Sequence, residues 1–248
     1  MSDHRRAVQS EFERAAHVFA ERTKGRFDDM AIVEFSRLRH GESVVEIGAG
    51  TGNFLALFSG VAGELVAVDV THGMLGEARA RNPALEAVVA DGARLPLRSA
   101  SMDLVASAQA VHHILEPVPI LEEMRRVAGP EGRVLVVDQI ASERFEEARA
   151  RTELEVLRDP SHAVSRPASA FRIMTRKAGL EIIDEQIAES RSRLSRWMWP
   201  GEFPPERIEA VREFIAARGH RTGMDFEPAG DDWYFTIRRI LVLAQVIT

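Results

Sequence analysis

The fold of this chain is decided by residues 44–54, which run Val-Val-Glu-Ile-Gly-Ala-Gly-Thr-Gly-Asn-Phe. An apolar strand that contains Glu46 breaks there into glycines at positions 48, 50 and 52. Nineteen residues after Gly50, a second apolar run ends in Asp69. Glycine lets a backbone approach a ligand closely, and a carboxylate at the tip of the next strand can bind both hydroxyls of a ribose. The pattern therefore predicts a nucleoside-containing cofactor at the carboxyl edge of a parallel sheet.

The glycine spacing narrows the choice of cofactor. Dinucleotide-binding proteins use G-x-G-x-x-G, whose third glycine would stand where this chain has Asn53. The spacing here is G-x-G-x-G, and Glu46 lies two residues before the first glycine. A carboxylate in that place would repel a pyrophosphate but suits a ligand that carries an ammonium and a sulfonium. S-adenosylmethionine carries both, so we favour it over NAD and keep an NAD-dependent oxidoreductase as the weaker alternative.

Later segments continue an alternation of strands and helices that is typical of a parallel sheet. Residues 85–91 predict a short strand that ends in Asp91, whose carboxylate is placed to accept the exocyclic amine of an adenine. A helix is expected before this strand, at residues 71–82. Further strands are expected at residues 101–109 and 132–138, with a helix at residues 117–128 between them.

With these motifs the chain resembles the class I S-adenosylmethionine-dependent methyltransferases, in particular the type 11 group that includes the ubiquinone and menaquinone C-methyltransferases. The matching stretch is residues 43–138, with weaker similarity to the end of the chain. The resemblance implies a Rossmann-like, doubly wound α/β fold. Its seven-stranded sheet would be mostly parallel, with an antiparallel last strand and helices on both faces.

The resemblance and the motifs assign the cofactor site to the glycine loop and to the ends of the following strands. The residues expected to bind the cofactor are Glu46, Gly48, Ala49, Gly50, Thr51, Asp69, Val70, Met74, Asp91, Gly92, Ala93 and Ser107. Core packing is an equal alternative for Met74. The acceptor is expected after the fourth strand, beside Ser107 and Gln109. His17 and Trp197 are further candidates to line the acceptor site, with core packing as their alternative.

Three histidines are candidates for a general base, because imidazole titrates near neutral pH. His112 and His113 follow the fourth predicted strand, and His162 lies close to Asp159 in a loop. Packing or positioning of the loop is the alternative for each. For His112 and His113 the resemblance favours that alternative, since such a pair recurs among relatives of differing chemistry.

Composition and charge count against several classes of function. The absence of cysteine excludes disulfides and thiolate metal sites, and no H-E-x-x-H or H-x-x-E-H cluster predicts a metal. A net charge of −6 argues against broad nucleic-acid binding. No apolar run approaches about 18 residues, and the first residues lack the apolar region of a secretory signal. We therefore expect a cytoplasmic protein with no integral membrane span.

The length of 248 residues fits one domain of the α/β kind. Residues 1–40 are expected to be helical, and in the resembling family such a segment lids the cofactor and substrate cleft; packing against the sheet edge is the alternative. Residues 41–248 would form the methyltransferase domain. It would include strands at residues 180–187 and 233–247, and a helical insertion at about residues 190–220.

The expected activity is transfer of a methyl group from S-adenosylmethionine to carbon or oxygen of a small-molecule acceptor, with S-adenosylhomocysteine as the product. In-line displacement needs the two reactants held in line, which contributes about 7–11 kcal/mol in well-oriented systems. A scaffold or sensor that binds the cofactor without catalysis is the second alternative. The sequence leaves monomer and homodimer open.

Overall fold

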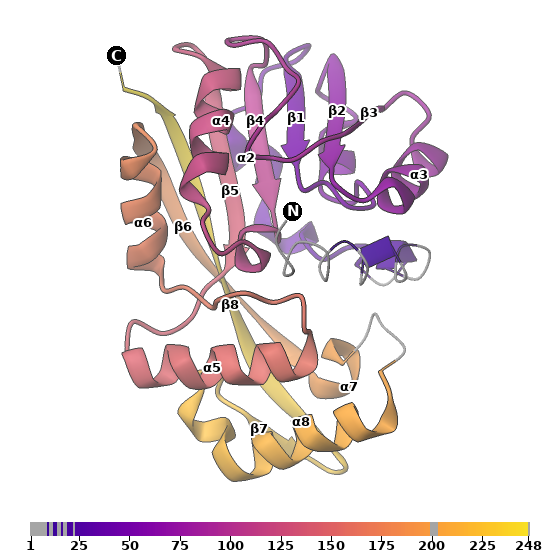
Figure 1. The fold of residues 1–248 in the computed structure, drawn as a ribbon, viewed down its shortest axis with the longest axis vertical. Helices are drawn as coiled ribbons and strands as arrows, with labels where there is room; N and C mark the ends of the chain where they lie inside the picture. Colours follow the sequence, from indigo (N-terminus) through magenta and orange to yellow (C-terminus); the bar gives the residue numbers. More distant parts are fainter. Residues whose placement is uncertain are drawn as a thin grey trace.

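The computed structural model describes residues 9, 12–13, 16, 19–21, 23–198 and 203–247. One sheet runs through the whole molecule and carries helices on both faces (Figure 1). A second, smaller lobe lies at the far end of its two longest strands (Figure 1). The chain therefore has a Rossmann-like body with an added lobe.

Five parallel strands form the part of the sheet that carries the glycine loop. They are β1 (Ser43–Ile47), β2 (Glu64–Asp69), β3 (Glu86–Val89), β4 (Leu104–Ala108) and β5 (Arg133–Gln139). The longer strands β6 (Leu180–Arg193) and β8 (Asp232–Val246) complete the order β3-β2-β1-β4-β5-β8-β6. β8 is antiparallel to both neighbours, which confirms the predicted fold and its antiparallel last strand. Within the described residues, the short strand β7 (Glu227–Ala229) pairs with β8 and adds an eighth strand to the seven predicted.

The central strands are apolar on both faces because helices cover both faces. Val45 and Ile47 of β1 pack on the face that is covered by α4 (Val118–Ala128) and α6 (Ala168–Lys177). Val44 packs on the opposite face, which is covered by α2 (Ile32–Ser36), the 3-10 turn η2 (Leu55–Phe58) and α3 (His72–Arg81). Since side chains alternate along a strand, Glu46 shares the second face with Val44. It is therefore a carboxyl group placed in an apolar layer.

The strand order places a crevice at the end of β1. From β1 the sheet continues outward to β2 and β3, and the chain then returns to place β4 on the other side of β1. The loops that follow β1 and β4 therefore leave the sheet in opposite directions. In doubly wound sheets ligands bind at the carboxyl ends of the strands at such a reversal.

β6 and β8 extend beyond the other strands as an antiparallel ribbon that carries the second lobe (Figure 1). The lobe consists of α5 (Phe145–Arg158), α7 (Leu194–Trp197), α8 (Pro205–Arg218), the 3-10 turn η4 (Gly219–Arg221) and β7. Its apolar core is separate from the two cores beside the sheet and includes Leu154, Val211, Ile215 and Phe235. The lobe thus has apolar packing of its own.

Element boundaries differ from the predictions in two places. β6 continues to Arg193, whereas a strand to residue 187 was expected. Its outer half pairs with β8 throughout, so backbone pairing decides its conformation rather than the polar composition. The helical insertion, expected from about residue 190, begins only at Leu194. Among the described residues, no helix combines the length and the apolar character needed to cross a membrane.

Candidate functional site

A cavity of about 710 Å³ lies at the carboxyl ends of β1, β2 and β4. Its walls come from the glycine loop, from the loops that follow β2, β3 and β4, and from the chain that precedes the 3-10 turn η1 (Asp28–Met30). The volume falls within the roughly 300–1,000 Å³ of small-molecule sites. Its position is the one where doubly wound folds bind nucleoside cofactors.

Glycine is suited to positions 48 and 50 of the loop after β1 for two different structural reasons. Gly48 and Gly50 adopt φ values of 74° and 52°, which glycine reaches without a Cβ penalty. A Cβ at Gly48 would lie 2.7 Å from the Cβ of Ala110, so no side chain fits there. A Cβ at Gly50 would meet nothing within 4 Å. Gly48 is thus fixed by packing, and Gly50 leaves open space beside the cavity that it lines.

Asp69 connects the glycine loop to the turn that follows β2. The Gly50 backbone N–H donates to Oδ2 of Asp69 at 2.8 Å, and the Thr71 backbone N–H donates to Oδ1 at 2.8 Å. Burial raises the pKa of Asp69, and these hydrogen bonds oppose that effect. A carboxylate has about four acceptor sites, so a ligand hydroxyl can bind beside these backbone donors. Asp69 can therefore fix the loop and bind ribose hydroxyls at the same time.

Glu46 is the least satisfied acid of the site. It is 1% exposed and lines the cavity, and its Oε2 has no hydrogen-bond partner among the described residues. Burial raises its pKa well above the ordinary value; a hydrogen bond from the Leu55 backbone opposes this, and the nearby Asp69 adds to it. A buried polar atom without a partner is costly, and a cationic ligand group would remove that cost. The orphaned oxygen therefore fits the ammonium of S-adenosylmethionine.

The loop after β3 closes the other side of the cavity. Oδ1 of Asp91 accepts a hydrogen bond from the Ala93 backbone N–H at 3.0 Å, which fixes the carboxylate. A Cβ at Gly92 would lie 2.8 Å from Cγ2 of Ile47, so the backbone packs directly on β1. Met74 of α3 is buried and also borders the cavity, which reconciles its two expected roles.

The structure gathers every residue that was expected to bind the cofactor around this one cavity. Ala49, Thr51, Val70 and Ser107 line it together with the residues described above. Gln109 lines it as well and adopts a φ of 53°, with its backbone N–H donating to the Val137 carbonyl at 2.8 Å. The Nε2 atom of Gln109 is buried and has no partner among the described residues. A hydrogen-bond donor is therefore available beyond the cofactor site.

The three candidate histidines meet in one cluster at the edge of the cavity. The ring centroids of His112 and His113 are 4.1 Å apart, and those of His112 and His162 are 5.4 Å apart. Among them only His113 lines the cavity. Nδ1 of His112 is 2.6 Å from Oδ1 of Asp138, and Nε2 of His162 is 3.0 Å from Oγ of Ser165. His112 and His162 thus stand behind His113.

Burial makes the imidazoles of His113 and His162 poor bases. Desolvation, followed by the charge of His112, lowers the pKa of His113 to about 4. Desolvation likewise lowers the pKa of His162 to about 3, although Glu155 opposes it. Nδ1 of His113 is 3.0 Å from the Ser161 carbonyl oxygen, which can only accept, so this nitrogen carries the proton and Nε2 is the basic atom. Near neutral pH His113 is an uncharged ring on the cavity wall.

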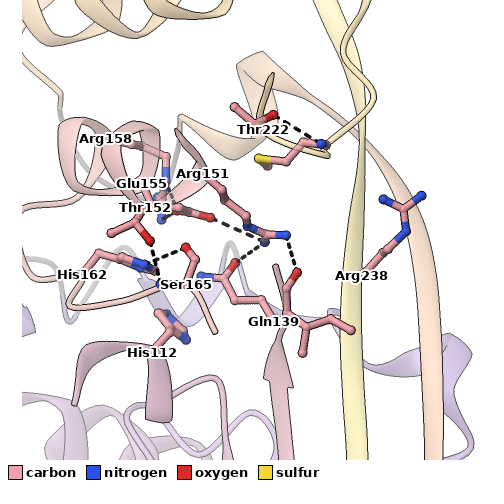
Figure 2. Close-up of polar contacts among 12 residues, drawn as sticks. His112, Gln139, Arg151, Thr152, Glu155, Arg158, His162, Ser165, Thr222 and Arg238 are labelled. Carbon is pink, nitrogen blue, oxygen red and sulfur yellow. Dashed lines mark hydrogen bonds and ion pairs between the residues drawn. The ribbon is translucent and has the colours of Figure 1, made fainter. Parts of the chain in front are cut away.

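A buried ionic network lies behind the histidines and joins the second lobe to the sheet. Figure 2 shows Arg151 and Arg158 of α5 directed at the same carboxylate, Glu155. Arg158 donates to one oxygen at 3.1 and 3.2 Å, and Arg151 approaches the other at 3.7 Å. Arg151 also donates to Oε1 of Gln139 at 3.2 Å and to the Ile140 carbonyl. Because Gln139 is the last residue of β5, the network fixes α5 relative to the end of that strand.

Trp197 and His17 are the two other residues that were expected to line the acceptor site. Trp197 does not line this cavity; its ring packs against Phe235 at 5.0 Å and under the Arg158 guanidinium at 4.6 Å, in the core of the second lobe. This corrects the expectation that Trp197 lines the acceptor site, because α7 turns it away from the sheet edge. His17 lies outside the described residues.

Sequence reasoning missed much of the wall that faces the cofactor site. The unpredicted lining residues include Gln9, Phe12, Phe19, Thr23, Arg26, Phe27, Leu115, Glu116, Pro119 and Ile120. The apolar spacing of Phe12 and Phe19 indicated a helix with one apolar face. Periodicity does not say which surface such a face covers, so the cavity contacts could not be deduced from it.

Comparisons with known proteins place this domain among methyltransferases. Residues 45–136 match the methyltransferase domain of type 11. The chain is 35% identical to demethylmenaquinone methyltransferase of Beutenbergia cavernae over 100 residues, which are 40% of this chain and 42% of that protein. It is 28% identical over 208 residues to the uncharacterized methyltransferase YcgJ of Bacillus subtilis, covering 82% of this chain and 80% of YcgJ. The crystal structure of YcgJ superposes with a TM-score of 0.80 at 23% identity, covering 88% of this chain and 97% of that chain.

The fold and the family match identify a domain of the class I S-adenosylmethionine-dependent methyltransferases. Within this class, residues 45–136 match the type 11 methyltransferase domain, and S-adenosylmethionine is the cofactor. The alignments span only about two fifths of the length of the demethylmenaquinone methyltransferases, 42% of each. The family match, over residues 45–136, ends before the second lobe begins at α5.

Proposed function

We propose that this protein transfers a methyl group from S-adenosylmethionine to a carbon or oxygen atom of a small-molecule acceptor. The observation that carries the proposal is Glu46, a buried carboxyl with an orphaned oxygen on the wall of a cavity that Asp69 and Gly50 also line. The names of the demethylmenaquinone methyltransferases support a small-molecule acceptor.

The chain's residues divide the binding task by chemistry. Glu46 receives the ammonium, Asp69 receives the ribose hydroxyls, and Asp91 receives the adenine amine. Gly50 leaves open space beside the cavity, where the backbone can approach the ligand closely. When bound, the cofactor supplies a methyl group already activated by a sulfonium. The protein therefore needs to orient the acceptor and exclude water rather than activate the donor.

Residues after β4 are placed to orient the acceptor. Ser107, Gln109 and His113 all line the cavity at the strand end beyond the glycine loop. Gln109 offers a buried donor, and His113 offers a neutral ring with Nε2 as its basic nitrogen. We infer that His113 positions the acceptor, and that a proton leaving an acceptor hydroxyl passes through it only where the acceptor requires a base. His112 and His162 then act through His113 as positioning residues.

We further propose that residues 1–40 act as a lid over the cavity. The described part of this segment is bonded to the cofactor loops. Nδ2 of Asn53 donates to the Ala20 carbonyl at 2.8 Å and to Oγ1 of Thr23 at 2.7 Å. Nε2 of Gln9 donates to the Val70 carbonyl at 3.0 Å. A lid belongs to the least stable part of a fold, so its amides should exchange faster in the free protein than with S-adenosylhomocysteine bound.

The test of the proposed activity is transfer of label from methyl-labelled S-adenosylmethionine to a panel of phenols, quinols, enols and amines. We expect label in at least one acceptor, together with release of S-adenosylhomocysteine. Glu46→Gln should lower the transfer strongly, and Glu64→Gln, the same change at an exposed position of β2, should not. Cofactor binding without transfer to any member of the panel would instead favour the scaffold or sensor alternative. Binding of NAD in place of S-adenosylhomocysteine would favour the oxidoreductase.

A further inference from the structure

Arg26 is a cation on the cavity wall that lacks an anionic partner. It is half-buried, it lines the cavity, and its guanidinium carbon lies 5.8 Å from the ring centroid of Phe19. Among the described residues, no hydrogen bond or ion pair of its guanidinium is formed; only its backbone N–H is bonded, to the Thr23 carbonyl. A charge that is partly removed from water is costly unless it is paired. An anionic group on a ligand would therefore stabilise the Arg26 guanidinium.

The surroundings of Arg26 are cationic. Besides burial, the charges of Arg239, Arg158 and Arg196 lower the pKa of Arg26 to about 9, and only Asp138 opposes them. Asp138 is already occupied: it accepts from the backbone N–H of His112 and lies 2.6 Å from the ring of the same residue. The one carboxylate whose charge acts on Arg26 is thus already engaged with His112.

The other arginines of this region are better satisfied. Arg158 and Arg151 share Glu155, as Figure 2 shows. Arg239 is 7% exposed and donates to Oγ of Ser190 at 2.8 Å, and it does not line the cavity. Arg26 is therefore the member of this group that faces a ligand.

The carboxylate of the cofactor itself does not match Arg26. The ammonium and the carboxylate of S-adenosylmethionine stand on one carbon atom, so a guanidinium that binds the carboxylate would also lie close to Glu46. The interactions that bear on Glu46 are burial, the Leu55 backbone and Asp69, not Arg26. The charges that act on Arg26 are instead those of Asp138 and of arginines of the second lobe and its ribbon. Asp138 holds the ring of His112, which packs against His113 of the cavity wall, so we assign Arg26 to the side of the cavity that carries His113.

We propose that the methyl acceptor carries a carboxylate or phosphate group and that Arg26 binds this anion. A guanidinium presents paired N–H donors that match the geometry of both anions. Nε2 of Gln109 supplies a further unpartnered donor in the same cavity. The inference rests on the proposed methyltransferase function and adds the charge class of its acceptor.

The test uses the full chain saturated with S-adenosylhomocysteine and titrated with benzoate, phenyl phosphate and benzamide, followed by ligand-observed NMR. Benzamide is the neutral match of benzoate. We expect one or both anions to bind at least about tenfold more tightly than benzamide. The anion that binds more tightly identifies whether the acceptor group is a carboxylate or a phosphate. Arg26→Gln should remove this preference and Arg26→Lys should keep part of it. Lys24→Gln, which removes an exposed charge from the same segment, should leave the preference unchanged.

A second titration separates the two possible sources of the anion. Arg26→Gln should bind S-adenosylhomocysteine and its decarboxylated analogue within about threefold of the unaltered chain. A tenfold loss for S-adenosylhomocysteine alone would assign Arg26 to the cofactor carboxylate and overturn the inference. Equal binding, or equal absence of binding, of the anions and benzamide would overturn it as well. Failure of the unaltered chain to bind S-adenosylhomocysteine would instead contradict the proposed methyltransferase function, on which this inference rests.

Discussion

The carboxylate of Asp69 accepts a hydrogen bond of 2.8 Å from the backbone of Gly50, a residue nineteen positions earlier in the chain. With its other oxygen it accepts from the Thr71 backbone at the same distance. One side chain at the tip of β2 therefore fixes the glycine loop of β1 and the start of α3 together. Removal of this carboxylate affects both the ligand contacts and the shape of the loop.

Asp69→Ala should weaken binding of S-adenosylhomocysteine by about one to two decades, because hydrogen bonds to a charged group are worth roughly 1.5–3 kcal/mol each. The affinity of Asp69→Asn should lie between those of the unaltered chain and of Asp69→Ala, because the amide keeps one acceptor oxygen for either backbone N–H. Calorimetric titration measures both changes, and circular dichroism controls for folding. Unchanged affinity in Asp69→Ala would remove the ribose assignment.

Binding of S-adenosylhomocysteine should release protons from the protein. Burial raises the pKa of Glu46 in the free chain, and an ammonium placed against it lowers that pKa in the complex. The carboxyl therefore loses a proton on binding, and affinity rises with pH, by up to about tenfold per pH unit below the pKa of the free chain.

Calorimetry in buffers of different ionisation enthalpy counts the protons released. Glu46→Gln should reduce that number because it removes this group, and any remaining release belongs to Asp69, whose pKa burial also raises. Glu64→Gln serves as the exposed control. Proton release that is the same in Glu46→Gln and in the unaltered chain would contradict the role of Glu46.

Gly48→Ala should destabilise the protein more than an ordinary change of glycine to alanine. The positive φ costs about 1–2 kcal/mol in a residue with a Cβ, and the contact with Ala110 adds about 1–3 kcal/mol of overpacking. Gly60→Ala is the matched control, because its Cβ would meet nothing within 4 Å. Urea unfolding measures the free energy of each variant. Equal stability of the two variants would show that the loop adapts to a side chain at position 48.

Most of the cofactor half of the molecule could be predicted from the sequence, because its binding residues lie close together along the chain. Glu46, the glycines and Asp69 fall within a single strand–loop–helix–strand unit, and parallel strands bring their ends to one edge. The mostly parallel sheet and its antiparallel last strand followed from the family resemblance. The extension of β6 could not be deduced from its composition, since its polar outer half is held by pairing with β8.

The acceptor half was less predictable because its residues come from distant segments. Arg26 precedes β1, Gln109 follows β4 and the histidines cluster through a loop after α5. Sequence reasoning found His112, His113 and His162 but could not show that His113 alone among them borders the cavity. Trp197 was misplaced because an aromatic residue in a helical pattern does not reveal which core it enters.

His113→Asn should lower turnover by less than about 100-fold. A general base contributes about 100- to 10,000-fold, so the expected loss lies below that range. Asn keeps a donor near the position of Nδ1 for the Ser161 carbonyl, so the loop is preserved. With a pKa of about 4, His113 should give no inflection in the rate between pH 5.5 and 8. The measurement needs an acceptor that turns over and a parallel check of cofactor affinity. A loss of more than about 1,000-fold with that affinity intact would make His113 the base.

The cavity beside Glu46 and Asp69 is inferred to hold S-adenosylmethionine. Calorimetric titration of the full chain with S-adenosylhomocysteine, and separately with NAD, is the decisive test of this inference. We expect one binding site for S-adenosylhomocysteine per chain and no binding of NAD. Absence of binding for S-adenosylhomocysteine, or saturable binding of NAD in the same cavity, would contradict it.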